Sequence, residues 1–375
     1  MTLTVFRRIL LITMFAFSTV VNAQQSDTPY QGSVKVVDAS EAQLKEKALE
    51  QVLVKVSGNA DITQSSETKQ LLKQTQQMLS QYGYQKIDGD EYFSATFDSK
   101  KINQALKEMQ QPVWGDTRPT TLIWLIKHNK LVSDNQIKAQ TDNTLSQAIK
   151  SAELARGIRV QFPLMDLEDN LALSVSDVKG RFYEQVGNAS FRYGRSHFVA
   201  AELQQMNNDR WKMSFQLLQK EESARRNRTL LSEEFVDSKS EVTKKMINVL
   251  ADYYAQQYAV LDNNGEKFTQ LLHIDGISSL AQLSQLNNTL KSLLVISSYN
   301  VVGAEGSKVS VEVKINGSVN SFKNTLIAQS HLQLDTTRPK TIEAMPIETL
   351  EKSEDNSLEN NVDNTHSNAL YFNWR

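Results

Sequence analysis

The amino-acid sequence predicts a mixed α+β or α/β protein made of several small mixed-sheet modules, the last a ferredoxin-like βαββαβ unit. Apolar residues recur at helical spacing in some stretches and alternate in others, and the two patterns follow one another along the chain. At 375 residues the chain also exceeds what one hydrophobic core usually serves. We therefore predict a signal peptide (1–23), an N-terminal α/β domain (24–118), a middle α/β domain (119–262), a ferredoxin-like domain (263–336) and a disordered tail (337–375).

The first residues have the pattern of a cleavable signal peptide. Arg7 and Arg8 precede an apolar run, residues 9–21, that is too short to cross a bilayer as a helix. Small side chains at Val21 and Ala23 fit the positions that a signal peptidase reads. We expect a periplasmic protein without a transmembrane anchor after cleavage; an uncleaved membrane helix or a buried hydrophobic helix is the alternative.

Composition limits the possible functions. The chain contains no cysteine, which excludes thiol catalysis, disulfides and thiolate zinc sites and favours a Gram-negative periplasm over a eukaryotic exterior. The 41 basic and 43 acidic residues give a net charge of -2 without a basic block, so we expect no nucleic-acid partner. The five histidines are scattered, and we expect no metal site built on them and no cofactor.

The N-terminal domain begins with a helix whose start and end are both marked. Ser40 is a good N-cap, apolar residues from Leu44 to Val56 form one face, and Gly58 provides the C-terminal turn. A second helix is predicted from Ser66 to Tyr82. A hairpin over residues 84–97, turning at residues 88–90, and a third helix over residues 98–110 complete the domain.

The middle domain is predicted from alternating strand and helix patterns. The apolar run 121–126 indicates a buried strand. The remaining elements are a helix (145–156), a short strand (158–162), two strands (190–203 and 210–218) and a long helix (241–258) capped by Ser238.

Residues 268–335 show the clearest order of elements. Strands over 273–277, 294–302, 309–315 and 332–334 enclose helices over 280–290 and 319–326, which is the split βαβ arrangement. Beyond Thr336 the apolar content is too low to offset the entropy of ordering, which predicts a disordered tail. In the alternative, its aromatic tip docks on a partner or on the protein's own sheet edge.

Three groups of residues are candidates for a binding site. Asp166, Glu168 and Asp169 follow a strand and could hold a hard cation, although turn-rich surroundings explain carboxylates equally well. Trp114, Arg118 and Trp124 surround a stiff connector; an arginine between two indoles would form a recognition surface, or the three would join two domains. Arg192 and Tyr193 either bind an anion or are exposed strand residues.

Four segments resemble a known family. They are residues 48–58 (ALEQVLVKVSG), residues 112–125 (PVWGDTRPTTLIWL), residues 156–169 and residues 189–194 (ASFRYG). In these the chain resembles an uncharacterised proteobacterial envelope family, the domain-of-unknown-function family numbered 2066, over residues 30–335. The first helix is also similar to the N-terminal module of periplasmic flagellar assembly proteins. The resemblance implies an envelope location and no particular activity.

The chain contains no nucleophile elbow, phosphate-binding loop or dinucleotide fingerprint. We therefore expect a noncatalytic periplasmic protein, a protein-binding or scaffolding module that contacts an envelope protein through sheet edges and the groove between domains. Two alternatives remain: a metal-dependent hydrolase centred on Asp166, Glu168 and Asp169, and a small-ligand binder with a site in the groove between the first two domains.

Overall fold

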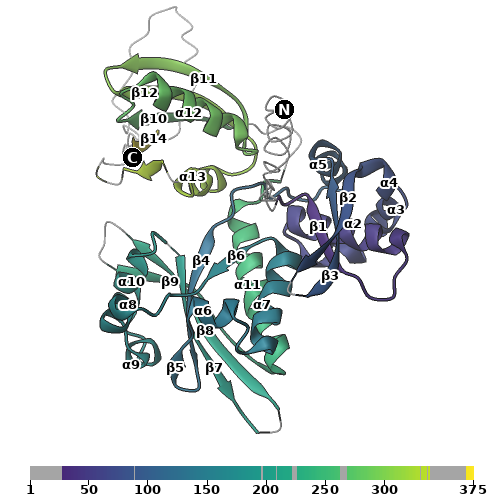
Figure 1. Cartoon of the computed structure of the whole chain (residues 1–375). Helices are drawn as coiled ribbons and strands as arrows, with labels where there is room; N and C mark the ends of the chain where they lie inside the picture. Colours follow the sequence, from purple (N-terminus) through teal and green to yellow (C-terminus); the bar gives the residue numbers. More distant parts are fainter. Residues whose placement is uncertain are drawn as a thin grey trace, which may run out of the picture.

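The computed structural model describes residues 28–375 apart from 88, 196, 208, 222–225, 262–267, 330, 336 and 338–368, so the expected signal peptide lies outside the described residues. The strands form three sheets in separate parts of the molecule (Figure 1). This arrangement confirms the predicted fold class of several small mixed-sheet modules. None of the described helices combines the length and the apolar content that crossing a membrane requires.

The first unit is a three-stranded antiparallel sheet, β1-β3-β2, covered by helices. Its elements are β1 (Gln31–Lys35), α2 (Glu41–Ser57), a 3-10 turn (Ala60–Gln64), α3 (Ser66–Leu72), α4 (Thr75–Met78), β2 (Leu79–Ile87), β3 (Asp90–Phe97) and α5 (Ser99–Glu108). Ser40 caps α2 by accepting a hydrogen bond from the Gln43 backbone, and Gly58 ends the helix in the left-handed region, with φ 72°. Both predicted ends of this helix are confirmed.

The predicted helix from Ser66 to Tyr82 is wrong in its second half. The chain is helical only to Met78, and β2 begins at Leu79. Tyr82 belongs to this strand, where its ring lies 5.5 Å from the ring of Phe93 on β3. Pairing with β3 and the aromatic contact therefore outweigh the helical spacing of the apolar residues in this segment.

The middle unit is a sheet with the strand order β5-β4-β7-β8-β9, in which β6 also pairs with β4. Its strands are β4 (Thr120–Lys127), β5 (Lys130–Leu131), β6 (Arg159–Gln161), β7 (His197–Gln205), β8 (Trp211–Glu221) and β9 (Arg226–Asp237). Its helices are α6 (Asp134–Lys138), α7 (Asn143–Arg156), α8 (Leu167–Ala172), α9 (Val175–Lys179), α10 (Tyr183–Phe191) and α11 (Lys239–Tyr258).

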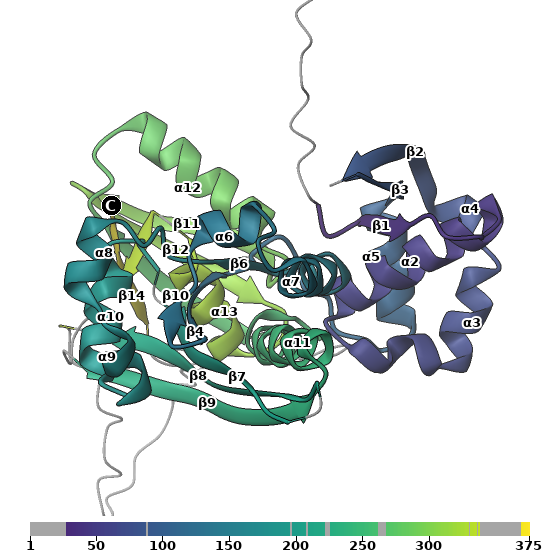
Figure 2. The same ribbon diagram turned by 60° about the horizontal axis from the view of Figure 1, so that its bottom comes forward.

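Both faces of this sheet are covered, which explains the apolar run in β4. Ile123 and Leu125 face a core shared with α7 and α11, whereas Leu122 and Trp124 face a second core shared with α9 and α10. When both faces of a strand are buried, its side chains are apolar on both faces and do not alternate with polar ones. The predicted buried strand is therefore confirmed. Helices α7 and α11 lie between this sheet and the first unit (Figure 2).

The predicted strand over residues 190–203 begins later than expected. Helix α10 continues to Phe191, Arg192 to Gly194 form a turn, and β7 starts at His197. Arg192 and Tyr193 therefore lie in a helix-to-strand connection rather than on an exposed strand.

The third unit has the predicted βαββαβ order and one additional strand. Its elements are β10 (Phe268–Asp275), α12 (Leu280–Ser292), β11 (Ile296–Glu305), β12 (Lys308–Ile315), α13 (Val319–Ile327), β13 (Leu332–Leu334) and β14 (Leu370–Trp374). The strand order is β11-β12-β10-β14-β13. The prediction of a disordered tail is wrong for residues 370–374, which form β14; residues 338–368 of that tail lie outside the described residues.

Candidate functional site

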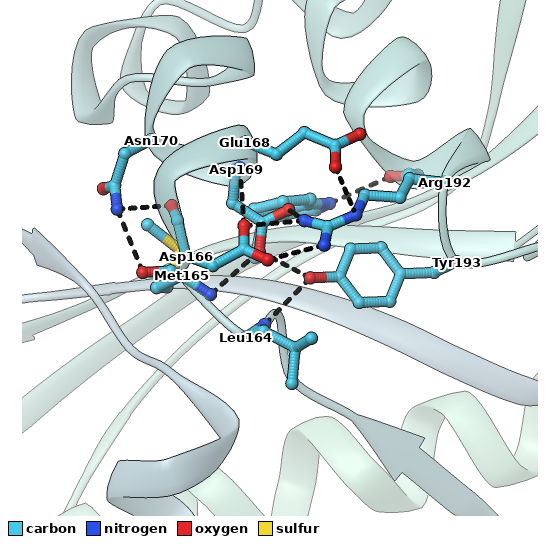
Figure 3. A network of polar contacts seen from close by, with 10 residues as sticks. Leu164, Met165, Asp166, Glu168, Asp169, Asn170, Arg192 and Tyr193 are labelled. Carbon is cyan, nitrogen blue, oxygen red and sulfur yellow. Dashed lines mark hydrogen bonds and ion pairs between the residues drawn. The ribbon is translucent and has the colours of Figure 1, made fainter.

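Two of the predicted residue groups form a single cluster (Figure 3). Asp166 is the N-cap of α8, where its side chain accepts a hydrogen bond from the Asp169 backbone at 3.0 Å. Arg192 and Tyr193 follow the end of α10. Since α8 and α10 pack together on the same face of the middle sheet, the turn after α10 meets the start of α8.

Arg192 is at the centre of this acidic cluster. Its guanidinium binds both carboxylate oxygens of Asp166, at 2.7 and 2.5 Å, and one oxygen of Asp169 at 2.9 Å. Its Nε lies 3.2 Å from the carboxylate of Glu168. One fork of donors therefore contacts all three carboxylates, in the bidentate geometry that arginine favours.

Tyr193 and the backbone satisfy the remaining oxygen of Asp169. The Tyr193 hydroxyl donates to Asp169 Oδ2 at 2.5 Å, the Met165 backbone N–H donates to the same atom at 2.8 Å, and the Leu164 N–H donates to the Tyr193 hydroxyl at 2.8 Å. The Asp169 side chain is only 1% exposed. Its buried charge is fully hydrogen-bonded, as a stable buried carboxylate requires.

The ionisation of the cluster follows from these contacts. Hydrogen bonds from the Arg192 guanidinium lower the pKa of Asp166 to about 2, and the same hydrogen bonds raise the pKa of Arg192. Burial and the hydrogen bond to Asp169 raise the pKa of Tyr193 to about 12, so its hydroxyl stays protonated at neutral pH. The pair of Asp166 and Arg192 therefore stays ionised from about pH 2 to well above neutral pH.

The geometry bears on the alternative in which Asp166, Glu168 and Asp169 hold a cation. Their carboxylates are directed at Arg192, whose positive charge occupies the place that a cation would take. Among the described residues, no group of three or more His, Cys, Asp or Glu side chains is arranged to hold a metal ion. The network instead fixes α8 against the turn that follows α10.

Trp124 belongs beside this cluster rather than beside Trp114. Its side chain is fully buried, its indole N–H donates to Ser190 Oγ at 2.9 Å, and its ring meets that of Tyr193 edge-on with centroids 6.2 Å apart. An arginine sandwiched between Trp114 and Trp124 is therefore not formed. Trp124 instead anchors α10, and with it the Arg192 turn, to the middle sheet.

Trp114 and Arg118 connect the first unit to the middle unit. The guanidinium of Arg118 stacks on the indole of Trp114 at 4.1 Å from the ring centre. It donates to the backbone oxygens of Lys55 at 2.7 Å, Trp114 at 2.9 Å and Gly157 at 3.0 Å. Lys55 lies in the last turn of α2 and Gly157 caps α7, so one cation binds two helix C-termini, where the helix dipole favours positive charge.

A second arginine strengthens this junction. Arg156, with a side chain only 4% exposed, donates to the Gly58 backbone oxygen at 3.0 Å and pairs with Asp252 of α11 at 2.5 Å. Gly58 itself lies against α11, because an added Cβ would come within 2.3 Å of the Ala255 side chain. The space in which we expected an inter-domain groove is filled at these contacts.

One feature of the third unit was missed in the sequence. His273 of β10 stacks on Tyr371 of β14 with centroids 5.0 Å apart, and its Nδ1 lies 2.8 Å from Ser310 Oγ of β12. These residues and the backbone of Gly303 line a shallow hollow of about 360 Å³. His273 alternates with buried Leu272 and Ile274, and this alternation was the available signal that it lies on the outer face of the sheet.

Comparisons with known proteins find a family model that matches one part of the chain. Residues 23–115 match a family described as a domain of unknown function, DUF8605. The first unit therefore contains an uncharacterised domain; the match covers less than half of the chain. No curated protein matches. A formyltetrahydrofolate deformylase from Pseudomonas putida KT2440 aligns with 61% of this chain and 92% of its own at 9% identity, with a TM-score of 0.16 that carries no argument.

Proposed function

We propose that this chain is a noncatalytic protein-binding or scaffolding module that takes up a partner at the free edge of its third sheet. The observation that carries the proposal is the exposure of β11. Within the part of the chain that the structure describes, this strand is the outermost of its sheet and pairs with β12 alone. An unpaired edge offers backbone donors and acceptors to an added strand.

The side chains of β11 suit a protein partner. Val301 and Val302 are adjacent yet 55% and 57% exposed. The strand register shifts between Val301 and Gly303, as at a β-bulge, and a bulge redirects neighbouring side chains from the regular alternation. Two valines thus face solvent on an open edge, an arrangement that favours association with another chain.

The carboxylate cluster supports a noncatalytic role. A catalytic carboxylate needs access to a substrate and a pKa near the working pH. Asp169 is buried and bound by Arg192, Tyr193 and the Met165 backbone, while Asp166 has a pKa of about 2. These contacts stabilise the fold and leave no oxygen of Asp169 for a substrate.

We further propose that the protein works in the Gram-negative periplasm, as the resemblance to family 2066 implies, and that its partner is an envelope protein. The leader pattern of residues 1–23 and the absence of cysteine support this location. The mass of the native protein tests it, since removal of the leader predicts a mature chain that begins near Gln24. Unprocessed protein in the cytosol would contradict the proposal.

Site-specific photocrosslinking in intact cells tests the partner surface. A photoreactive residue at Val302 should give one dominant adduct, and Val301→Lys in the same chain should remove it. The matched control is a probe at Leu280, which is 85% exposed in the same unit and belongs to helix α12 rather than to the edge strand. Equal adducts from both positions would reject β11 as the binding edge.

A further inference from the structure

Strand β14 occupies an unusual place in the third sheet. In a ferredoxin-like βαββαβ unit the first and last strands are antiparallel neighbours. Here β14 lies between them, parallel to β10 and antiparallel to β13. All six elements of the βαββαβ order precede β14 in the sequence, and β14 lies between the two strands that such a unit would pair directly.

The side chains of β14 alternate as an inserted strand requires. Phe372 is 1% exposed and joins the core of the third unit, and Leu370 and Trp374 pack against the same core. Tyr371 lies on the opposite face, stacked on His273. The space therefore selects an apolar residue and two aromatic residues at alternate positions, with Phe372 as the deepest anchor.

Backbone and ring contacts hold the two ends of β14. Near its start, the Asp335 backbone N–H donates to the Tyr371 oxygen at 2.9 Å; past its end, the Arg375 N–H donates to the His331 oxygen at 2.9 Å. The ring of Trp374 stacks on that of His331 with centroids 5.6 Å apart. Residues 371–375 make all of these contacts, so one short segment accounts for the attachment of β14 at both of its ends.

The connection from β13 to β14 is much longer than the geometry needs. Adjacent antiparallel strands are usually joined by two to five residues. Leu334 and Leu370 end and begin these two strands, so residues 335–369 join them. A connection of this length does not fix the register of β14. Without β14, β13 would lose its strand pairing and would be held through Leu332, which is 3% exposed in the core of the third unit.

We propose that the space between β10 and β13 is a peptide-binding site, filled in cis by β14, that accepts an extended segment of a partner protein with the same alternation of apolar and aromatic residues. This site is separate from the β11 edge. A partner segment competes with a tethered one, whose effective concentration is on the order of millimolar. A partner segment can therefore displace β14 only when the partner is held close to the site. Binding of β14 from one copy of this chain to the site of another copy is disfavoured at micromolar concentration.

Cutting the connection in the full chain tests the proposal. A single protease site inserted after Leu350 allows β14 to be detached covalently while it remains bound. A fluorescein-labelled peptide of residues 369–375 is then titrated by anisotropy. The cut protein should bind one peptide per chain, and the uncut protein should bind it about 100-fold more weakly, because the tethered strand competes at its effective concentration.

Two matched peptides identify the contact. Phe372→Asp should abolish binding, because it places a charge in the core, whereas Asn373→Ser should bind normally, because Asn373 is exposed and serine adds no charge beside Asp275, its register partner on β10. Binding of the Phe372→Asp peptide as tight as that of the original would overturn the proposal, and so would loss of folded structure on cutting. A dimer of the uncut protein in size-exclusion chromatography would assign the site to a second copy and overturn a partner's segment as its occupant.

Discussion

Replacing Arg118 by leucine should separate the first unit from the middle unit. The change removes the donors to the backbone oxygens of Lys55, Trp114 and Gly157, which lie 2.7 to 3.0 Å from the guanidinium. A buried acceptor without a partner costs about 1–3 kcal/mol, which gives an upper range near 9 kcal/mol for the three. Burial already disfavours the cation, lowering the pKa of Arg118 to about 9, so leucine recovers part of this cost. We expect a net loss of about 3–5 kcal/mol.

The assay is urea unfolding followed by tryptophan fluorescence and by circular dichroism. Wild-type protein should show coincident transitions for the two units, and Arg118→Leu should show an earlier transition of the first unit, because the contacts across the junction are weakened. Arg118→Lys should unfold at a urea midpoint between those of the wild type and Arg118→Leu, because one ammonium group cannot reach both helix ends as the guanidinium does. Arg159→Leu, at an exposed position of β6, is the matched control. An unchanged midpoint for Arg118→Leu would refute this account of the junction.

Three further outcomes are expected. Burial lowers the pKa of His197 to about 4, below its value of 6.5 in the unfolded chain. The free energy of unfolding should therefore be highest above pH 6.5 and fall by about 3 kcal/mol as the pH drops to 4. His197→Gln should flatten this pH dependence in urea titrations. Arg192→Gln should lower the melting temperature and return the pKa of Asp166, followed by NMR, toward 3.8, whereas the exposed Glu168→Gln should change neither. Dialysis against EDTA should leave the melting temperature unchanged; a clear drop would restore the metal hypothesis.

Local signals predicted most helices and the third unit well. Ser40, Asp98 and Ser238 each cap the helix that follows them, as short polar side chains do. The alternation from Val309 to Ile315 predicted β12. Its four inward residues are all buried: Val309, Val311, Val313 and Ile315. These features depend on a residue and its near neighbours, and such information is present in the sequence.

Features that depend on distant contacts were not predictable in this way. Leu79 and Tyr82 carry helical spacing, but pairing with β3 places them in a strand. The position of β14 depends on two strands that lie far from it in the sequence. Docking of the aromatic tip on the protein's own sheet edge was one of the alternatives, but so short a pattern does not indicate the register between β10 and β13.

The candidate site was predicted as separate groups. Asp166 and Arg192 were both recognised, but nothing in their separation of 26 positions indicates that they pair. The carboxylates were therefore interpreted without their counter-ion, which is why a cation site seemed reasonable. The reverse error applies to Trp114 and Trp124, which are close in sequence but face different cores.

Arg118 and Arg192 both bind groups at the ends of helices. Arg118 binds carbonyls at the C-terminal ends of α2 and α7, and Arg192 binds the carboxylates in the first turn of α8. Their hydrogen-bonding capacity is used within the fold, where it fixes how the elements meet. Among the described residues, an exposed strand edge that no other described strand covers lies instead at β11. Partner binding is therefore best sought with strand-directed variants rather than by charge reversal at the arginines.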